Sequence, residues 1–391
     1  MRLLSKLMAG SAAAATLVAL AAGPALADPP TGTTPKATDV VGVGSDTIEF
    51  LVDQFSHDYD NTQSGAKLYS WDATNPSTGA MGDPIVTKSG CASIARPDGS
   101  SAGITQLDAN TADGSNFCVD YARSSRGRAA TDPPYAAGGI AFDALAGDAV
   151  TYATRNSASG GTNAPVTLTT GQLKNIFLCK TTNWDKVGGQ SGTILPFLPQ
   201  VGSGTRAFFL TALGGGVTPI TPGSCVNSTV QENEGIDSQL DSPDAIVPFS
   251  VGKYIAEVYH SAACLNSACT PNGSGQVCTP TGKQNLFGCD EAGVLGLDKI
   301  NKSDPATPWP LPAPPSNKPK INPKFSALFQ RTVYIVVRYD ASTADHIPAY
   351  LEKFFAAKNA STPGWMCKNA KATTDIKDYG FLPTPLCGST S

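Results

Sequence analysis

One arrangement occurs three times along this chain and limits the folds open to it. Each time, a turn of Gly with Ser or Thr leads into a helix pattern, and an apolar stretch precedes the first and the third turn. The three turns are residues 44–47, 99–101 and 202–206. After the first turn, apolar residues recur with helical spacing at Ile48, Leu51, Val52 and Phe55. Alternating strands and helices predict an α/β architecture with mainly parallel sheets.

Composition is consistent with a packed protein of this class. The 391 residues include 39 Gly and 30 Pro, which is below the roughly 25–30% that is typical of low-complexity chains. The length suits one large domain or two lobes of ordinary size. The formal net charge of −4 argues against a nucleic-acid partner, because such binding needs clustered cations.

The first 27 residues have the form of a secretory signal peptide. Arg2 and Lys6 precede an Ala-rich apolar run, which closes on Ala25, Leu26 and Ala27. A membrane anchor is the weaker alternative, because Ala-rich segments insert poorly. The mature chain is therefore expected to start at Asp28 and to be secreted. No Cys follows the cleavage site to carry a lipid anchor.

Ten cysteines follow the signal peptide. An even number in an oxidising compartment favours disulfides. The simplest pairs of neighbours are Cys91 with Cys118, Cys179 with Cys225, and Cys367 with Cys387; Cys264, Cys269, Cys278 and Cys289 would staple one Cys-rich excursion. Zinc is the weaker reading, because there is no Cys-x-x-Cys pair and the three His are scattered. No metal and no cofactor are expected.

Other segments predict further elements of the α/β fold. Residues 140–142 and 149–152 are expected to be extended, and the apolar run 333–337 is typical of a strand buried on both faces. Thr170 is expected to cap a helix that carries Leu173 and Phe177. A last helix is expected around Ile347, Tyr350, Leu351 and Phe354. Residues 262–325 are predicted to be a Cys-rich and Pro-rich insertion, with eight Pro between 305 and 323.

The three turns together favour an anion site. Gly permits close approach of the backbone, Ser or Thr supplies a hydroxyl, and the first turn of the following helix offers free N–H groups. In an open α/β fold such turns gather at the carboxyl ends of the strands, so all three can converge on one cleft. The alternative for any single turn is that Ser, Thr or Asp only caps a helix.

Several segments, in this order, resemble the periplasmic phosphate-binding proteins of ABC transporters, which have a type II solute-binding fold. The similar segments are the Gly-x-Gly turn at 42–47, the Ser-Gly loop at 99–103, residues 120–125, residues 168–184, the Ser-Gly-Thr loop at 203–205, residues 232–235 leading to 246, and more loosely residues 379–385. The resemblance covers most of the mature chain, and it identifies the chain as a divergent secreted member of this family.

The resemblance implies two lobes with a ligand cleft between them. The first lobe is expected from residues 38–138 plus 331–387, and the second from residues 139–330, with crossing strands between them. A tetrahedral oxyanion would be held between the lobes. The candidate ligand-binding residues are Asp46, Thr47, Ser100, Ser101, Ser125, Arg126, Ser203, Gly204, Thr205 and Arg206.

The chain departs from the family at the charged positions. Ser125 stands where the family has its phosphate-reading Asp, and Pro199 and Val201 stand where it has an Arg and an Asp. Arg206, together with Arg123 or Arg126, could restore a cation, since a guanidinium suits phosphate geometry. Asp46 could accept the proton of monohydrogen phosphate, or it could serve only as a helix cap.

The resemblance therefore predicts a solute-binding protein for phosphate or a related oxyanion, with an ABC transporter permease as its possible partner. The chain is expected to be a monomer and not an enzyme. The main alternative is a secreted protein on the same fold that scavenges, or binds the cell wall or a partner, with weak or no phosphate binding. A phosphoester hydrolase that uses the anion site is the third hypothesis.

Overall fold

The computed structural model describes residues 28–29, 33–76, 79–109, 112–113, 116–259, 269–272, 275–278, 292–312, 318–356, 361 and 363–391. The predicted signal peptide, residues 1–27, lies outside the described residues. So does the predicted pairing of the four cysteines between 264 and 289. No helix among the described residues is long and apolar enough to cross a membrane.

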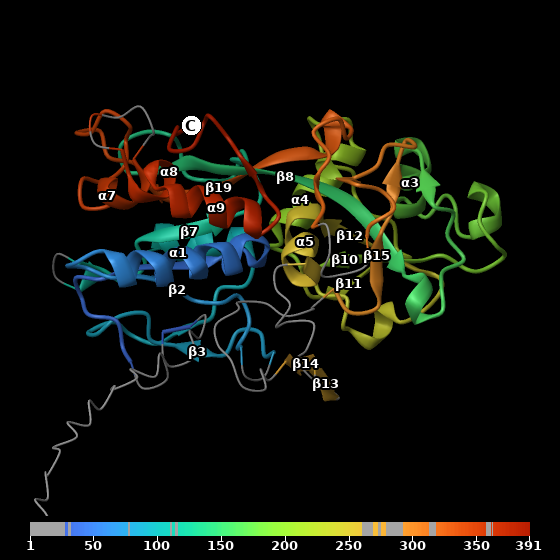
Figure 1. Cartoon of the computed structure of the whole chain (residues 1–391), viewed down its shortest axis with the longest axis horizontal. Helices are drawn as coiled ribbons and strands as arrows, with labels where there is room; N and C mark the ends of the chain where they lie inside the picture. The colour runs from blue at the N-terminus through green and yellow to red at the C-terminus, as the bar shows by residue number, and fades with distance from the viewer. Residues whose placement is uncertain are drawn as a thin grey trace, which may run out of the picture.

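One mixed sheet extends through the whole molecule (Figure 1). Its strands lie in the order β11 (Asn227–Val230), β10 (Leu195–Pro199), β12 (Ala245–Ser250), β8 (Ile140–Arg155), β19 (Gln330–Arg338), β7 (Tyr121–Ser124), β1 (Val40–Gly44) and β2 (Leu68–Ser70). Two short strands, β15 (Leu295–Leu297) and β20 (Leu382–Pro383), also pair with β8.

The expectation of mainly parallel sheets is correct only at the two ends of this sheet. β1 is parallel to β2 and β7, and β10 is parallel to β11 and β12. At the centre, β8 is antiparallel to β12 and β19, and β19 is antiparallel to β7. The two segments predicted at 140–142 and 149–152 are parts of the single 16-residue strand β8, which has neighbours in both halves of the sheet.

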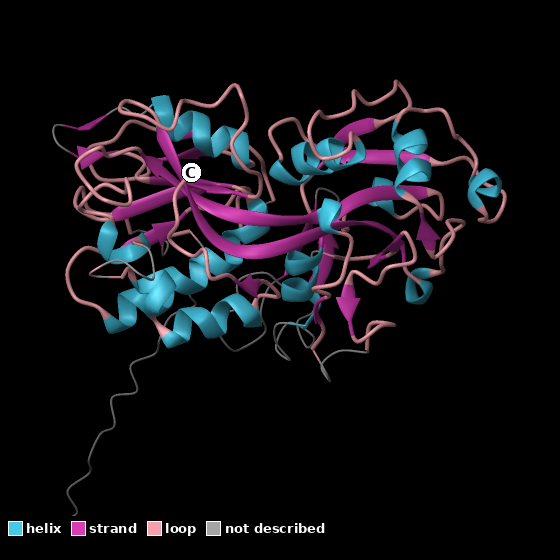
Figure 2. Ribbon diagram, turned by 90° about the horizontal axis from the view of Figure 1, so that it is seen from above, coloured by secondary structure: helices cyan, strands magenta, loops and turns pink. Residues whose placement is uncertain are grey.

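Helices cover the two halves of the sheet and give two lobes side by side, with long strands passing between them (Figure 2). The helices are α1 (Glu49–Thr62), α2 (Ser100–Ala109), α3 (Thr170–Phe177), α4 (Gly204–Leu213), α5 (Val251–Tyr259), α7 (Glu352–Phe355), α8 (Trp365–Lys368) and α9 (Ala370–Asp378), with short 3-10 turns η1 (Asp46–Ile48), η2 (Ser157–Ser159), η3 (Trp184–Val187), η4 (Ser238–Leu240) and η5 (Ala327–Phe329). We call the half with β1, β2, β7, α1 and α2 the first lobe, and the half with β10, β11, β12, α3 and α4 the second lobe.

Among the described residues, five strand pairs lie outside the main sheet. They are β3 (Pro84–Ile85) with β4 (Ile94–Ala95), β5 (Ala112–Asp113) with β6 (Asn116–Phe117), β9 (Thr167–Leu168) with β16 (Lys299–Ile300), β13 (Cys269–Asn272) with β14 (Gly275–Cys278), and β17 (Ala306–Thr307) with β18 (Lys320–Ile321). The last pair joins the two ends of the Pro-rich segment.

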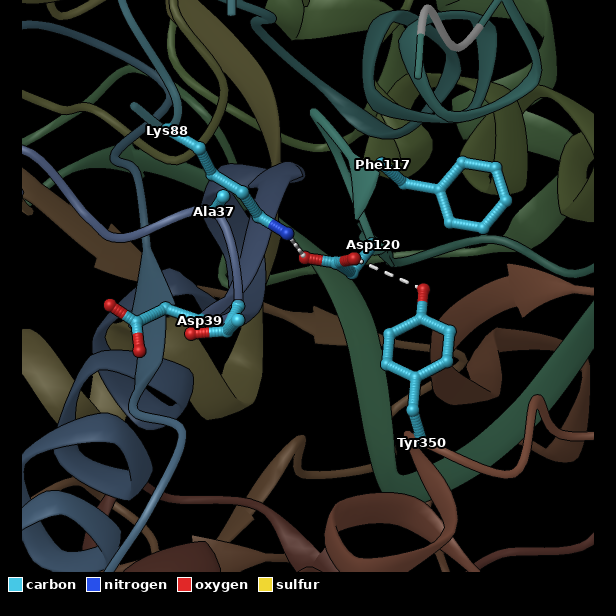
Figure 3. Close-up of a pocket in the computed structure, with 7 residues that line it drawn as sticks. Ala37, Asp39, Lys88, Phe117, Asp120 and Tyr350 are labelled. Atoms are coloured by element: carbon cyan, nitrogen blue, oxygen red, sulfur yellow. Dashed lines mark hydrogen bonds and ion pairs between the residues drawn. The ribbon is translucent and has the colours of Figure 1, made fainter. Parts of the chain in front are cut away.

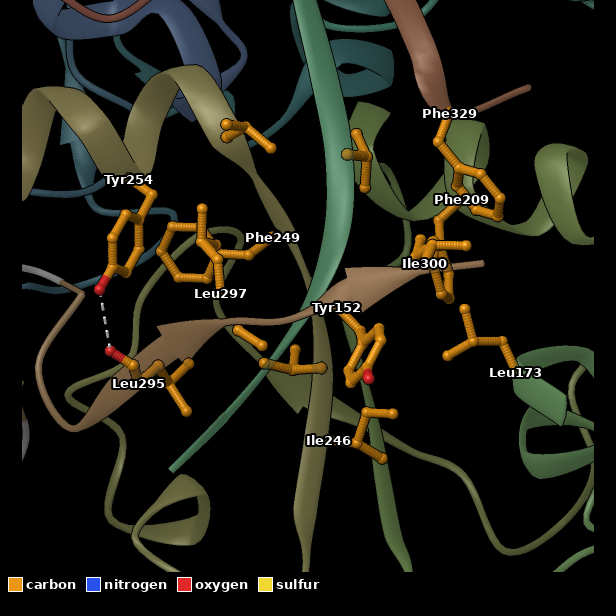
Figure 4. Packing of buried hydrophobic residues seen from close by; sticks show 14 of the residues in the cluster. Tyr152, Leu173, Phe209, Ile246, Phe249, Tyr254, Leu295, Leu297, Ile300 and Phe329 are labelled. Atoms are coloured by element: carbon orange, nitrogen blue, oxygen red, sulfur yellow. Dashed lines mark hydrogen bonds between the residues drawn. The ribbon is translucent and has the colours of Figure 1, made fainter. Parts of the chain in front are cut away.

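Each lobe has its own apolar core. In the second lobe, Tyr152, Phe209, Phe249 and Phe329 pack in one cluster with Leu173 (Figure 4). Two further clusters fill the first lobe. The first half of β8 contributes to the first-lobe clusters, through residues such as Ala141 and Phe142, and its second half contributes Val150 and Tyr152 to the second-lobe cluster. The expected lobe limits at residues 139 and 330 stay a prediction.

Three of the predicted disulfides are confirmed: Cys91–Cys118, Cys179–Cys225 and Cys367–Cys387. Two local predictions are wrong. The residue that caps α3 is Thr169, one earlier than expected, and it forms a capping box with Gln172. The predicted last helix near Phe354 is only the single turn α7, and α8 and α9 follow it.

Candidate functional site

The first Gly-Ser turn lies at the carboxyl end of β1, at the border between the lobes. Asp46 opens the turn η1, but its carboxylate does not cap α1. Instead, Asp46 Oδ1 pairs with Lys253 Nζ at 2.9 Å and Oδ2 accepts a hydrogen bond from Asn233 Nδ2 at 3.0 Å. Since Asp46 is 2% exposed, this ion pair joins the lobes in a dry environment. The prediction that Asp46 accepts a proton from a bound ligand stays a prediction.

The second turn touches the third across the border between the lobes. The amide of Ser101 donates to the carbonyl of Gly202 at 3.0 Å. Gly99 has φ +91°, and a Cβ there would lie 2.8 Å from the Gly202 oxygen, so both the conformation and the contact require Gly. The two turns therefore meet as expected.

The third turn supplies the start of α4. Ser203 caps this helix, because its hydroxyl accepts the Arg206 amide at 3.0 Å. A Cβ on Gly204 would come within 2.2 Å of Ser100 Oγ and 2.3 Å of Ser125 Oγ. Gly204 thus lets the first turn of α4 lie directly against two hydroxyls of the first lobe.

Three neutral donors, from the first turn, the third turn and the residue after β7, converge on one oxygen atom. The hydroxyls of Thr47 and Ser125 donate to Glu232 Oε1 at 3.1 and 3.2 Å, and the amide of Thr205 donates to the same atom at 2.9 Å. All four residues are 0% exposed. We call Thr47, Ser125 and Thr205 the cradle. It combines hydroxyls of the first lobe with a helix N-terminus of the second, and a helix N-terminus favours bound anions.

Neighbouring polar groups orient the hydroxyls of the cradle. Ser45 Oγ donates to Ser125 Oγ at 3.0 Å, and Asn233 Nδ2 donates to Thr47 Oγ1 at 3.1 Å. The Ser100 hydroxyl accepts the Ser125 amide at 3.0 Å. Because each hydroxyl already accepts a hydrogen bond, its own proton is directed at Glu232.

The arginines predicted to supply a cation are engaged elsewhere. Arg126 pairs with Asp132 at 2.7 Å and also donates to the Ser101 hydroxyl. Arg206 donates to the Pro199 carbonyl at 2.9 Å. Arg123 is fully buried and donates to the carbonyls of the first turn. Of the predicted site residues, the structure brings Thr47, Ser125 and Thr205 together around one atom, with Ser100 and Gly204 beside them.

Two cations close to the cradle were missed from the sequence. Arg331, which is 8% exposed, donates to Thr205 Oγ1 at 3.0 Å and pairs with Asp148 at 2.8 Å. Lys253 lies on α5 and is 1% exposed. The one signal for Lys253 was the pair of charged residues, Lys253 and Glu257, in the otherwise apolar pattern of α5. Arg331 is the second residue of β19, next to Gln330, and gave no comparable signal.

A partly buried carboxyl group links the lobes beside the cradle. Asp98 Oδ1 accepts hydrogen bonds from Gln200 Nε2 at 2.7 Å and from Gln231 Nε2 at 2.9 Å. Burial, followed by the charges of Glu232 and Asp46, raises the pKa of Asp98 to about 7, against the opposing effect of the two amides. Protonation of Asp98 is therefore expected near neutral pH.

A separate cavity of about 300 Å³ lies at the amino ends of β1 and β7, away from the cradle (Figure 3). Lys88 and Asp120 form an ion pair of 2.6 Å in its wall, and the Tyr350 hydroxyl donates to Asp120 at 3.0 Å. These charged groups satisfy one another. No group of three or more His, Cys, Asp or Glu in the described part of the chain could hold a metal ion.

Comparison with known proteins identifies the family. Residues 29–278 match the PBP superfamily domain, so the chain belongs to the periplasmic-binding-protein superfamily. The two-lobed α/β fold agrees with this assignment, and the predicted fold class is confirmed. A search of curated proteins found no match.

Solved structures are similar to this chain at low sequence identity. One is a putative phosphate ABC transporter substrate-binding protein with bound phosphate from Clostridium perfringens, with a TM-score of 0.50, 12% identity, and coverage of 88% of this chain and 99% of that one. Another is an ABC-type phosphate transport receptor from Vibrio cholerae, with a TM-score of 0.46, 16% identity, and coverage of 88% and 100%. The similarity to the Clostridium perfringens protein supports the fold of this chain and no more detailed property.

Proposed function

We propose that this chain is a secreted solute-binding protein that captures a small tetrahedral oxyanion, phosphate first, between its two lobes for ABC-type uptake. The observation that carries the proposal is the cradle, in which donors from both lobes meet on one carboxylate oxygen. A site that binds a carboxylate oxygen in this way has the donors that a phosphate oxygen needs.

Three further observations support parts of this proposal. The confirmed disulfides fit an oxidising compartment. The similar protein from Clostridium perfringens was solved with bound phosphate. The family and the similar structures are binding proteins, so we propose a binding function without a reaction. An ABC transporter permease is the proposed partner, and the proposed state is a monomer.

The second candidate is a secreted protein on the same fold that has a role other than transport, with weak or no phosphate binding. It is favoured by the Glu232 carboxylate inside the cradle and by the engagement of Arg126 with Asp132. Neither guanidinium predicted to read phosphate, Arg126 or Arg206, is directed at the cradle.

Thermal unfolding with phosphate, sulfate, arsenate and phosphonates distinguishes the two candidates. A ligand present at one hundred times its Kd stabilises a protein by about 2.7 kcal/mol. The transport proposal predicts a clear rise in Tm with phosphate or arsenate. No shift with any of the anions at millimolar concentration would favour the second candidate.

A further inference from the structure

Three consecutive residues that follow β11 reach across to the first lobe. Gln231 donates to Asp98 at 2.9 Å, Glu232 accepts from Thr47 and Ser125, and Asn233 donates to Asp46 at 3.0 Å. We call Gln231, Glu232 and Asn233 the clasp. They are 8%, 0% and 2% exposed, so the whole clasp lies within the closed border between the lobes.

The turn that carries the clasp is shaped to make these contacts. Asn233 adopts a left-handed backbone with φ of 55°, which costs less free energy in Asn than in most residues other than Gly. Its side chain compensates, because the Ser250 amide donates to Asn233 Oδ1 at 2.8 Å while Nδ2 donates to the first lobe. The clasp is thus anchored to β12 of its own lobe as well as to the first lobe.

The two carboxylate oxygens of Glu232 differ in their hydrogen bonds. Oε1 takes the three donors of the cradle, whereas Oε2 is buried without a hydrogen-bond partner among the described residues. All three donors are neutral groups. The carboxylate of Glu232 is buried, and three directed donors hold one of its oxygens. It is therefore arranged like a bound oxyanion, except that the chain itself supplies it.

We propose that Glu232 is a built-in ligand of the cradle. Its carboxylate takes the place of a solute oxyanion and holds the two lobes closed, and a free oxyanion binds only when this side chain leaves. The binding of a free oxyanion after Glu232 leaves rests on the function proposed above. The closure of the lobes by Glu232 without solute does not rest on it. Two anions cannot share the cradle, because like charges repel strongly where water is excluded.

The neighbouring charges add to this exclusion. Asp46 and Asp98 lie on the first-lobe side of the clasp, and the charges of Glu232 and Asp46 both act on Asp98. Lys253 and Arg331 each already pair with an acid, Asp46 and Asp148 respectively. A divalent phosphate would thus meet Asp46 and Asp98 as well as Glu232, while Lys253 and Arg331 are already paired with acids.

The test compares the mature wild-type chain with Glu232→Ala, Glu232→Gln and the control Asp185→Asn. Asp185 also lies in the second lobe, and its carboxylate is 42% exposed, so this control changes the net charge without touching the cradle. Small-angle X-ray scattering measures the radius of gyration without added anion and with inorganic phosphate. Calorimetric titration measures phosphate affinity, and circular dichroism checks that each variant is folded.

We expect the wild type and Asp185→Asn to be compact with or without phosphate. Glu232→Ala should expand without phosphate, contract when phosphate is added, and bind phosphate at least tenfold more tightly than the wild type. Glu232→Gln keeps an acceptor oxygen and loses the charge, so it should be less open than Glu232→Ala and still bind phosphate more tightly than the wild type.

Failure of the proposed phosphate binding and failure of the proposed closure by Glu232 give different results. A Glu232→Ala chain that expands but never binds phosphate would uphold the closing role of Glu232 and overturn phosphate as the solute. Folded Glu232→Ala and Glu232→Gln chains that both stay as compact as the wild type, and bind phosphate no more tightly, would overturn the built-in ligand.

Discussion

The cradle depends on close approach between the lobes, and Gly204, which lies beside it, shows this most clearly. A Cβ at this position would lie 2.2 Å from Ser100 Oγ and 2.3 Å from Ser125 Oγ. Both hydroxyl groups are fully buried, so neither can move aside freely. The first turn of α4 therefore reaches the first lobe only without a side chain at 204.

We predict that Gly204→Ala lowers the free energy of unfolding by about 1–3 kcal/mol, because the added methyl group overpacks a closed site. The matched control is Gly171→Ala in α3, where a Cβ would have no neighbour closer than 4.0 Å. That variant should be neutral or more stable by up to about 1 kcal/mol. Urea unfolding of both variants checks the prediction, and equal effects at the two positions would contradict it.

A second residue-scale prediction concerns Asp98, whose pKa is raised to about 7 mainly by burial. The native state keeps this proton between about pH 4 and pH 7, while the unfolded chain loses it, so stability falls as pH rises through this window. Asp98→Asn removes that loss. We expect the variant to gain stability over the wild type as pH rises from 4 to 7, with no further gain above 7.

The measurement is urea unfolding of both chains at several pH values. Asp298→Asn serves as a comparison, because burial also raises the pKa of Asp298 to about 7, and this residue contacts Thr154 within the second lobe. A stability difference between Asp98→Asn and the wild type that is the same at pH 4 and pH 7 would show that Asp98 is ionised in the native state.

The sequence predicted part of this site. Gly beside Ser or Thr at a helix start is a local pattern, and the three turns do meet. Glu232 could not be predicted as an occupant of the cradle, because its position depends on the path of a loop that crosses from the other lobe. The partners of Arg126 and Arg206 are also set by loop geometry that no local pattern encodes.

At the scale of elements, β8 joins the lobes. The sequence predicts that residues 140–142 and 149–152 are extended, and Gly147 and Asp148 interrupt the apolar pattern between them. In the structure, Asp148 is buried and pairs with Arg331 of β19, so the polar residue belongs to the strand. The antiparallel centre of the sheet likewise follows from long-range pairing between β8 and β19, which local periodicity does not report.

The predicted disulfide between Cys179 and Cys225 is confirmed by the structure, and it links two elements of the second lobe. The bond ties the segment after α3 to the segment before β11. The two cysteines are 46 residues apart in the sequence. Replacing both cysteines with Ala should lower the free energy of unfolding by about 2–4 kcal/mol, chiefly because the unfolded chain gains freedom. Chemical unfolding under non-reducing conditions measures the loss. An unchanged stability would contradict the proposed contribution of this bond.

Across the whole molecule, buried carboxyl groups favour stability at mildly acidic pH. Burial raises the pKa of Asp53 to about 7 and of Asp60 to about 6, and raises the pKa of Asp72 and Asp143 well above its usual range. These groups hold protons in the native state that the unfolded chain loses above about pH 4. The unfolded state then binds fewer protons, so stability decreases with rising pH.

We therefore predict that the free energy of unfolding of the wild type falls between about pH 4 and pH 7. Below pH 4 the trend reverses, because ion pairs lower the pKa of Asp83 and Asp132, and these pairs are lost when the acids are protonated. Urea unfolding from pH 3 to pH 8 gives the profile. A steady rise in stability from pH 4 to pH 7 would show that the buried acids are ionised in the native chain.

At the scale of the whole molecule, the central claim is that the cradle is an oxyanion site which the chain fills with Glu232. Crystals of Glu232→Ala grown with arsenate test this claim most directly, because arsenic gives an anomalous signal. We predict an arsenic peak whose oxygens lie within hydrogen-bond distance of Thr47 Oγ1, Ser125 Oγ and the Thr205 amide. A folded variant with no arsenic peak at these three groups would contradict the account.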